Sequence, residues 1–175
     1  MSSCYLCQVR KKQQNTKGEW REFDFIIGID PGVKTGFAAF ANNDGKKLHR
    51  LTVSELPIWS VFELLNKFYY DRNHSIFVVL EDARKTRRPK GVSLEESEAK
   101  KMGAGWIRTL SGVYESYLIA HNIPYLTKKK GVTKLTAATF LQITGVQTKD
   151  AEHNARDAGM MVWQYPFKVY VSNSK

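Results

Sequence analysis

The sequence has no long apolar run, and none approaches the roughly 20 residues that an α-helix needs to cross a bilayer. Its N-terminus, MSSCYLCQVRKK, carries charge but lacks the apolar stretch that a secretory signal requires. No association with a membrane is therefore expected, and we predict an intracellular protein.

Cysteine is also scarce, with only Cys4 and Cys7, in a C-x-x-C spacing. One such pair offers at most two ligands, whereas a structural zinc site usually needs four. A redox C-x-x-C motif is expected beside a βαβ unit, but this pair lies in a polar N-terminal segment. We interpret the pair as part of a reduced tail, with a zinc ion shared across a dimer as the open alternative.

Acidic residues are in short supply, with 17 Asp and Glu against 27 Lys and Arg, which gives a net charge of +10. A surplus of this size favours polyanionic partners, of which nucleic acid is the commonest. A basic surface without a specific partner is the alternative. The length of 175 residues suggests one domain. We expect it at residues 23–175, after a basic N-terminal extension at residues 1–22.

Apolar runs separated by turn signals predict alternating strands and helices. Strands are expected at residues 25–29, 36–41, 48–53, 76–80 and 123–126, with a hairpin turn at 42–45. Helices are expected at residues 58–68, 93–120, 133–142 and 150–163, the second either continuous or broken near residues 103–105. Three antiparallel strands followed by alternating helices and strands predict an α/β fold, with a mixed five-stranded sheet flanked by helices. This element order resembles that of the RNase H-like fold.

Three carboxylates occupy notable positions in this pattern. Asp30 ends the first strand, Glu81 ends the fourth, and Asp157 lies in the last helix among small residues. Carboxylates at strand ends can converge on one edge of a sheet, and a closely packed helix can add a third. Such a cluster repels itself unless divalent cations neutralise it, and Mg2+ prefers oxygen ligands. Taken singly, each residue is also compatible with a turn, a strand-end cap or a solvated helix face.

The segment FIIGIDPGVKTGFAAF, residues 25–40, joins an apolar strand to G-x-D-P-G, a Thr-Gly pair and a second strand. Shorter motifs follow at residues 78–81, 102–106, 134–141 and 157–162. Across residues 24–165 these segments together resemble the RuvC family of Holliday-junction resolvases, and only the first is specific by itself. The resemblance implies a homodimeric endonuclease that cleaves branched DNA. It also implies that Asp30, Glu81 and Asp157 are catalytic and hold Mg2+ or Mn2+, with two ions per active site.

The fourth ligand departs from the family pattern. The family usually has Asp or His three residues before its final Asp, and here Asn154 occupies that position. His153 lies four residues before Asp157, and helical offsets of three and four share a face. His153 is the preferred fourth group, as a metal ligand or proton handler, with a surface histidine as the equal alternative. Asn154 can still bind a metal through its carbonyl oxygen.

Basic residues in two loops and one helix are the expected DNA contacts. They are Arg84, Lys85, Arg87, Arg88, Lys128, Lys129, Lys130 and Lys134. The first loop stands where the family often has an aromatic wedge, and its arginines can either stack on bases or contact phosphates alone.

Three further alternatives stay open on the sequence. The small residues Gly103, Ala104 and Gly105 suit either a dimer interface or helix packing within one chain. The chain could be a non-catalytic, branched-DNA-binding module, for which the basic loops suffice. An actin-like phosphate-binding domain fits Asp30-x-Gly32 superficially, but such proteins need two domains and far more residues.

Overall fold

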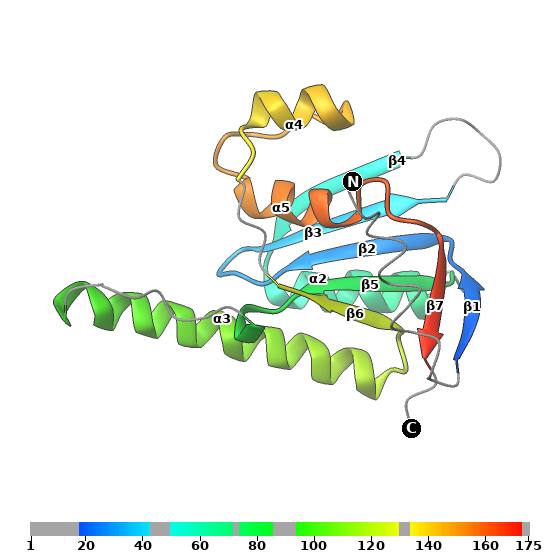
Figure 1. The fold of residues 1–175 in the computed structure, drawn as a ribbon, viewed down its shortest axis with the longest axis horizontal. Helices are drawn as coiled ribbons and strands as arrows, with labels where there is room; N and C mark the ends of the chain where they lie inside the picture. The colour runs from blue at the N-terminus through cyan, green and yellow to red at the C-terminus, as the bar shows by residue number, and fades with distance from the viewer. Residues whose placement is uncertain (1–17, 43–49, 72–73, 86–93, 130–133, 173–175) are drawn as a thin grey trace, which may run out of the picture.

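The computed structural model describes residues 18–42, 50–71, 74–85, 94–129 and 134–172 (Figure 1). A five-stranded sheet forms the centre, in the order β4-β3-β2-β5-β6. Its strands are β2 (Phe25–Asp30), β3 (Thr35–Ala41), β4 (Arg50–Leu56), β5 (Ile76–Glu81) and β6 (Tyr125–Lys128). β3 pairs antiparallel with β2 and β4, whereas β5 pairs parallel with β2 and β6. The prediction of an α/β chain with a mixed five-stranded sheet flanked by helices is confirmed.

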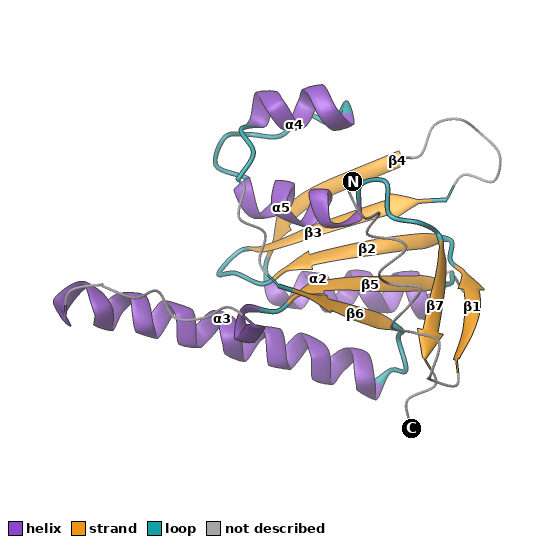
Figure 2. Cartoon of the chain, in the orientation of Figure 1, coloured by secondary structure: helices purple, strands orange, loops and turns teal. Residues whose placement is uncertain are grey.

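The helices cover both faces of this sheet (Figure 2). They are α2 (Ile58–Asn66), α3 (Leu94–Ala120), α4 (Ala137–Thr144) and α5 (His153–Val162). A π-helical turn, η1 (Lys67–Asp71), extends α2, and a 3-10 turn, η2 (Ala83–Lys85), follows β5. Among the described residues, no helix is both long and apolar enough to span a membrane.

Of the two forms expected for α3, the structure has the continuous one, which runs through Gly103 and Gly105 without a break. Two other helices begin later than expected. α4 begins after Thr136, whose side chain accepts a hydrogen bond from the Thr139 amide at 3.2 Å; the expected cap, Thr133, lies outside the described residues. α5 begins three residues later than expected because residues 149–152 form a turn closed by a 3.0 Å bond from the Glu152 amide to the Lys149 carbonyl.

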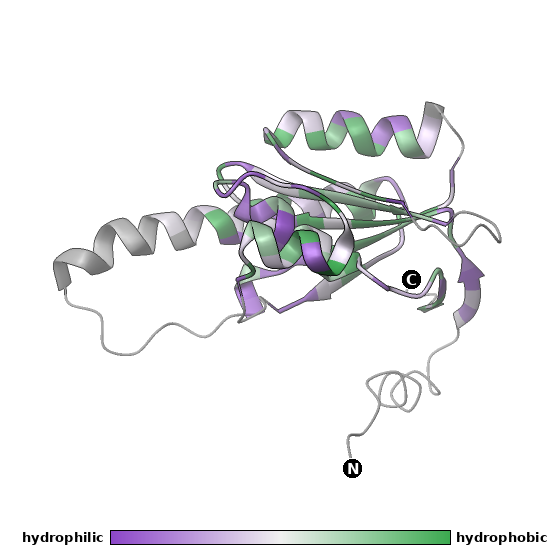
Figure 3. Ribbon diagram, turned by 90° about the horizontal axis from the view of Figure 1, so that it is seen from above, coloured by the Kyte–Doolittle hydropathy of each residue, from purple (hydrophilic) through white to green (hydrophobic). Residues whose placement is uncertain are grey.

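Two apolar cores lie on opposite faces of the sheet, because side chains of a strand alternate between its faces. One core packs Ile27, Ile29, Val78 and Leu80 against α2 and α3. The other packs Ile26, Phe40, Phe77 and Val79 against α4 and α5. The strands of the central sheet are accordingly mostly green in the hydropathy colouring of Figure 3.

A separate two-stranded sheet lies beside the main sheet (Figure 1). It pairs β1 (Gly18–Glu22) antiparallel with β7 (Lys168–Ser172). The Phe23 amide bonds to the Phe167 carbonyl at 3.0 Å, and the Phe167 ring stacks on Phe40 with centroids 5.1 Å apart. β1 lies within residues 1–22, which were expected to form an N-terminal extension outside the domain. Its sequence, GEWRE, has no apolar alternation, so its order comes from pairing with β7, which is distant in sequence.

Candidate functional site

Asp30 and Glu81 lie side by side at one end of the sheet. In the parallel pairing of β2 with β5, Ile29 is opposite Leu80, so one further step brings Asp30 beside Glu81. Neighbouring strands are about 4.8 Å apart. Both carboxylates are buried, with 2% of Asp30 and 5% of Glu81 exposed. The fold therefore places two acidic side chains next to one another in a region that is largely shielded from water.

Helix α5 crosses this end of the sheet in direct backbone contact. A Cβ atom at Gly28 would lie 2.4 Å from the Ala158 carbonyl oxygen, and one at Gly36 would lie 1.9 Å from the Asn154 carbonyl oxygen. Only glycine permits this approach at both positions. Gly36 is the partner of Asp30 in the β2–β3 pairing, so the helical turn from Asn154 to Ala158 lies over the Asp30 end of β2.

Strand alternation directs the two buried carboxylates towards that helix. Ile26 and Phe77 belong to the core that packs on α5, and Asp30 and Glu81 lie an even number of residues further along the same strands. Asp157 belongs to the turn of α5 above them and is half-buried. All three predicted carboxylates thus belong to the α5 side of the sheet.

These residues do not form a closed three-ligand cluster. Within the described ranges, no group of three or more His, Cys, Asp or Glu side chains is arranged to hold a metal ion. The structure brings Asp30 and Glu81 together, and it places Asp157 on the helix that covers them. Buried carboxylate oxygens are ligands of the kind that Mg2+ and Mn2+ take, so the donor chemistry fits the predicted metal.

Lys128 lies at the same end of the sheet, as the β6 partner of Glu81. Its Nζ donates to the Met161 carbonyl of α5 at 3.4 Å and lies 5.6 Å from the centroid of the Tyr165 ring. Burial lowers the pKa of the Lys128 ammonium. Lys128 is therefore a half-buried residue beside the carboxylates, whereas Lys129 and Lys134 are exposed, as DNA contacts require. Lys130 lies outside the described residues.

The two candidates for a fourth ligand differ in their contacts. His153 is exposed, with its Nδ1 3.1 Å from the Ala151 carbonyl oxygen. Asn154 is half-buried, and its Nδ2 donates to the Lys34 carbonyl at 2.8 Å. That bond fastens Asn154 to the loop that follows Asp30, while its Oδ1 is the atom that could face a metal. Both residues remain candidates.

Two positioning residues were not anticipated from the sequence. Glu55, at the end of β4, accepts a 2.9 Å bond from the Asn154 amide in the first turn of α5, where a carboxylate is favoured by the helix dipole. Arg156 is buried, with 4% exposed. Its guanidinium donates to the carbonyls of Leu135 at 3.0 Å, Lys149 at 2.6 Å and Asp150 at 2.9 Å. Arg156 stands between Ala155 and Asp157, and nothing in that pattern indicates a buried arginine.

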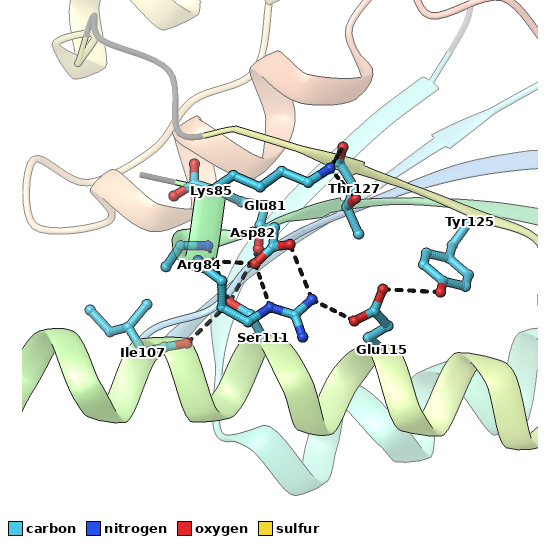
Figure 4. A network of polar contacts seen from close by, with 10 residues as sticks. Glu81, Asp82, Arg84, Lys85, Ile107, Ser111, Glu115, Tyr125 and Thr127 are labelled. Carbon is cyan, nitrogen blue, oxygen red and sulfur yellow. Dashed lines mark hydrogen bonds and ion pairs between the residues drawn. The ribbon is translucent and has the colours of Figure 1, made fainter. Parts of the chain in front are cut away.

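Arg84 and Lys85, both predicted DNA contacts, are engaged within the chain (Figure 4). Arg84 forms ion pairs with Asp82 and Glu115. The hydrogen bond from Arg84 lowers the pKa of the Asp82 carboxyl, and the same bond raises the pKa of Arg84. Lys85 Nζ donates to the Thr127 carbonyl at 2.8 Å. Arg87 and Arg88 lie outside the described residues.

No model of a known protein family matches the chain, and a search of curated proteins finds no significant relative. The class that the fold defines is an α/β protein with a mixed five-stranded sheet flanked by helices. Its candidate site is the end of that sheet at which β2, β5 and β6 finish beneath α5.

Proposed function

We propose that this chain is a RuvC-like endonuclease of the RNase H-like fold, which cleaves branched DNA by metal-dependent phosphodiester hydrolysis. One observation carries the proposal: Asp30 and Glu81 are buried in adjacent strands, beneath the helix that bears Asp157. Buried like charges raise one another's free energy unless a cation lies between them. The motif resemblance across residues 24–165 supports the same conclusion.

In this proposal Asp30, Glu81 and Asp157 hold the cations, and His153 or Asn154 completes the set. When bound, a pair of Mg2+ or Mn2+ ions supplies an activated water and neutralises charge at the leaving 3'-oxygen. The glycines at positions 28 and 36 keep α5 close enough for Asp157 to reach the strand ends. Lys128 adds a positive charge beside Glu81, where an approaching phosphate would lie.

The proposed assembly is a homodimer, because a four-way junction needs symmetric cuts in two strands. Among the described residues, no atom lies within 4 Å of a Cβ built at Gly103 or Gly105, so contacts within the described part of the chain do not require glycine at these positions. Nearby on α3, Trp106 is 54% exposed and Val113 is 42% exposed. This part of α3 is the surface that we expect a second copy to cover.

The test is incubation of the purified protein with an end-labelled four-way junction in Mg2+, in Mn2+ and in chelator. We expect paired cuts near the crossover in either metal and none in chelator. Linear duplex of the same sequence is the substrate control, and Asp30→Asn is the protein control. Binding of the junction without cleavage in either metal would instead favour the non-catalytic DNA-binding module.

A further inference from the structure

We propose that Arg84 is a positioning residue, which holds the end of β5 so that Glu81 keeps its place beside Asp30. This inference rests on the proposed function, since it assigns Glu81 to the reacting site. Arg84 acts through a group of three charged residues, Asp82, Arg84 and Glu115, which we name the β5 clasp (Figure 4). The clasp lies between the end of β5 and α3, on the side of the sheet opposite α5.

The first half of the clasp is a fork between neighbouring residues of the chain. Arg84 donates to Asp82 Oδ1 from its backbone amide at 3.0 Å and from Nε at 2.7 Å, and to Oδ2 from Nη2 at 3.0 Å. Asp82 is 4% exposed, whereas 39% of the Arg84 side chain is exposed, so the carboxylate end of these bonds is shielded from water. Paired bonds from a planar guanidinium to a carboxylate fix both the relative orientation of the two groups and the distance between them. The turn after Glu81 is therefore held in one conformation.

The second half joins that turn to α3. Arg84 Nη2 also donates to Glu115 Oε2, and Glu115 Oε1 accepts a 3.1 Å bond from the Tyr125 hydroxyl of β6. One guanidinium thus links the end of β5 to a helix, and through that helix residue to the neighbouring strand. These bonds connect the end of β5, α3 and β6. Displacement of any one of these three elements therefore disturbs the other two.

A contact from α3 reaches Glu81 itself. The Ser111 hydroxyl lies 3.4 Å from the Glu81 carbonyl oxygen and 3.4 Å from the Ala83 amide nitrogen, so it spans Asp82 on both sides. On the other side, the Asp82 amide donates to the Lys128 carbonyl at 2.7 Å. The Ser111 hydroxyl also donates to the Ile107 carbonyl of its own helix at 3.0 Å. The backbone at the end of β5 therefore contacts both α3 and β6. The clasp maintains the separation between α3 and β5 on which the Ser111 contacts depend.

This arrangement separates Arg84 from the other arginines of the same basic segment. The Arg84 side chain is 39% exposed, but its Nε and Nη2 already donate to two carboxylates, which leaves them unavailable for a phosphate. A lysine in its place would keep the charge but lose the fork geometry. Substitution by lysine therefore distinguishes positioning from a phosphate contact, because a phosphate contact tolerates it.

The test compares Arg84→Lys and Arg84→Met with Arg88→Met, the control from the same basic segment. Three quantities are measured on the full-length protein: junction affinity as a function of salt, single-turnover cleavage with protein in excess, and Mn2+ affinity by electron paramagnetic resonance. We expect both Arg84 variants to lose about 10- to 100-fold in cleavage rate and in Mn2+ affinity, the usual range for groups that orient metal ligands. Junction affinity and its salt dependence should remain those of the wild type. Arg88→Met should weaken junction binding and reduce its salt slope, and it should leave Mn2+ affinity at the wild-type value.

A wild-type rate and Mn2+ affinity in Arg84→Lys would overturn the proposal, as would a loss confined to DNA affinity with a reduced salt slope. Glu115→Gln weakens the clasp without removing Arg84, so it serves if the Arg84 variants fail to fold, and it should show a smaller loss of the same kind. Failure of the proposed function is distinguishable, because wild-type protein would then cut no junction. In that case Mn2+ affinity still reports on whether Arg84 positions Glu81.

Discussion

Glu81 and Asp82 are consecutive acidic residues with opposite surroundings. Glu81 ends β5 beside Asp30 and beneath α5, so a second carboxylate lies next to it. Asp82 accepts three bonds from Arg84 on the side of α3. Both are buried, and Asp82 forms an ion pair with the Arg84 guanidinium. An acid paired in this way supports structure, whereas two buried carboxylates at adjacent strand ends suit a cation.

The same contrast extends to the two faces of the sheet. The α5 face carries Asp30, Glu81, Asp157 and Lys128 at its polar end, and we propose that the reaction takes place there. The α3 face carries the β5 clasp and the apolar contacts of α2 and α3, and we assign support to it. Substitution of the three carboxylates on the first face should abolish activity at little cost in stability, and substitutions on the second face should mainly cost stability or positioning.

The largest expected effect is on the α5 face. Asp30→Asn, Glu81→Gln and Asp157→Asn should each lower single-turnover cleavage by about a hundredfold or more, because each removes a negative oxygen from the cation site. Junction binding should stay the same or tighten, since one charge that repels phosphate is lost. Asp82→Asn is the matched control, and it should retain more activity than Glu81→Gln. Near wild-type cleavage by Asp30→Asn would show that the site is assigned wrongly.

The second prediction for the α5 face concerns which residue is the fourth metal ligand, His153 or Asn154. His153→Ala should lose most of its cleavage rate, about a hundredfold if histidine handles a proton, and Asn154→Ala should lose less. Asn154 offers only a neutral oxygen, and hard cations favour carboxylates. Single-turnover cleavage of both variants decides between them. An inactive Asn154→Ala beside an active His153→Ala would establish the three-residue spacing of the family and reverse our preference.

Most of the fold could be predicted because its strands bury apolar side chains on both faces. Residues 25–29 and 76–80 are uninterrupted apolar runs, and both became central strands. β1 and β7 could not be predicted, since GEWRE has no apolar period and its order depends on pairing with a segment at the far end of the chain. The late start of α5 depends on a backbone turn at residues 149–152, for which no local pattern was recognised.

The site was less predictable than the fold. Strand-end positions indicated Asp30 and Glu81, because parallel neighbours must end at one edge. Charge alone could not tell a DNA-contacting arginine from an internal one, so Arg84 was grouped with Arg88 although its fork is occupied by Asp82 and Glu115. The sequence also gave no sign that Arg156 is buried, since that depends on carbonyl groups from three other positions.

Substitution of Arg156 tests whether the α5 face also contains a residue that stabilises the fold. Arg156→Met should lower the free energy of unfolding by about 2 to 4 kcal/mol, because buried carbonyls lose charged donors that methionine cannot replace. Chemical denaturation measures this loss, with exposed Lys149→Met as the control. A loss below 0.5 kcal/mol, on the order expected for a surface substitution, would mean that the carbonyls find other partners.

DNA affinity should distinguish lysines whose ammonium groups bind DNA from one whose ammonium group is hydrogen-bonded within the chain. Lys129→Ala combined with Lys134→Ala should weaken junction binding and reduce the salt slope by about 2, since each phosphate contact contributes about 0.9. Lys85→Ala should change the slope little, because its ammonium is bound to Thr127. Affinity measured at several salt concentrations gives both slopes. Equal changes in the two proteins would show that the bond to Thr127 does not keep Lys85 from the phosphates.

The smallest effect concerns Tyr114, which is fully buried on the α3 face and donates a 2.9 Å bond to Thr35 Oγ1. Burial raises the pKa of this phenol from 10.0 to about 12. Between these values the unfolded chain releases the proton and the folded chain keeps it, so stability is retained below pH 10 and falls as pH rises towards 12. The loss attributable to Tyr114 should reach about 2 to 3 kcal/mol.

Tyr114→Phe should cost about 1 kcal/mol near neutral pH, from the lost hydrogen bond, and should remove this part of the alkaline decline. Denaturation curves at pH 8 to 12 test both statements, with half-buried Tyr117→Phe as the control that should alter the decline less. Parallel curves for wild type and Tyr114→Phe would mean that the phenol is ionised equally in both states. Cleavage at neutral pH should be unchanged in Tyr114→Phe. A large loss there would show that the α3 face acts on the reaction beyond the β5 clasp.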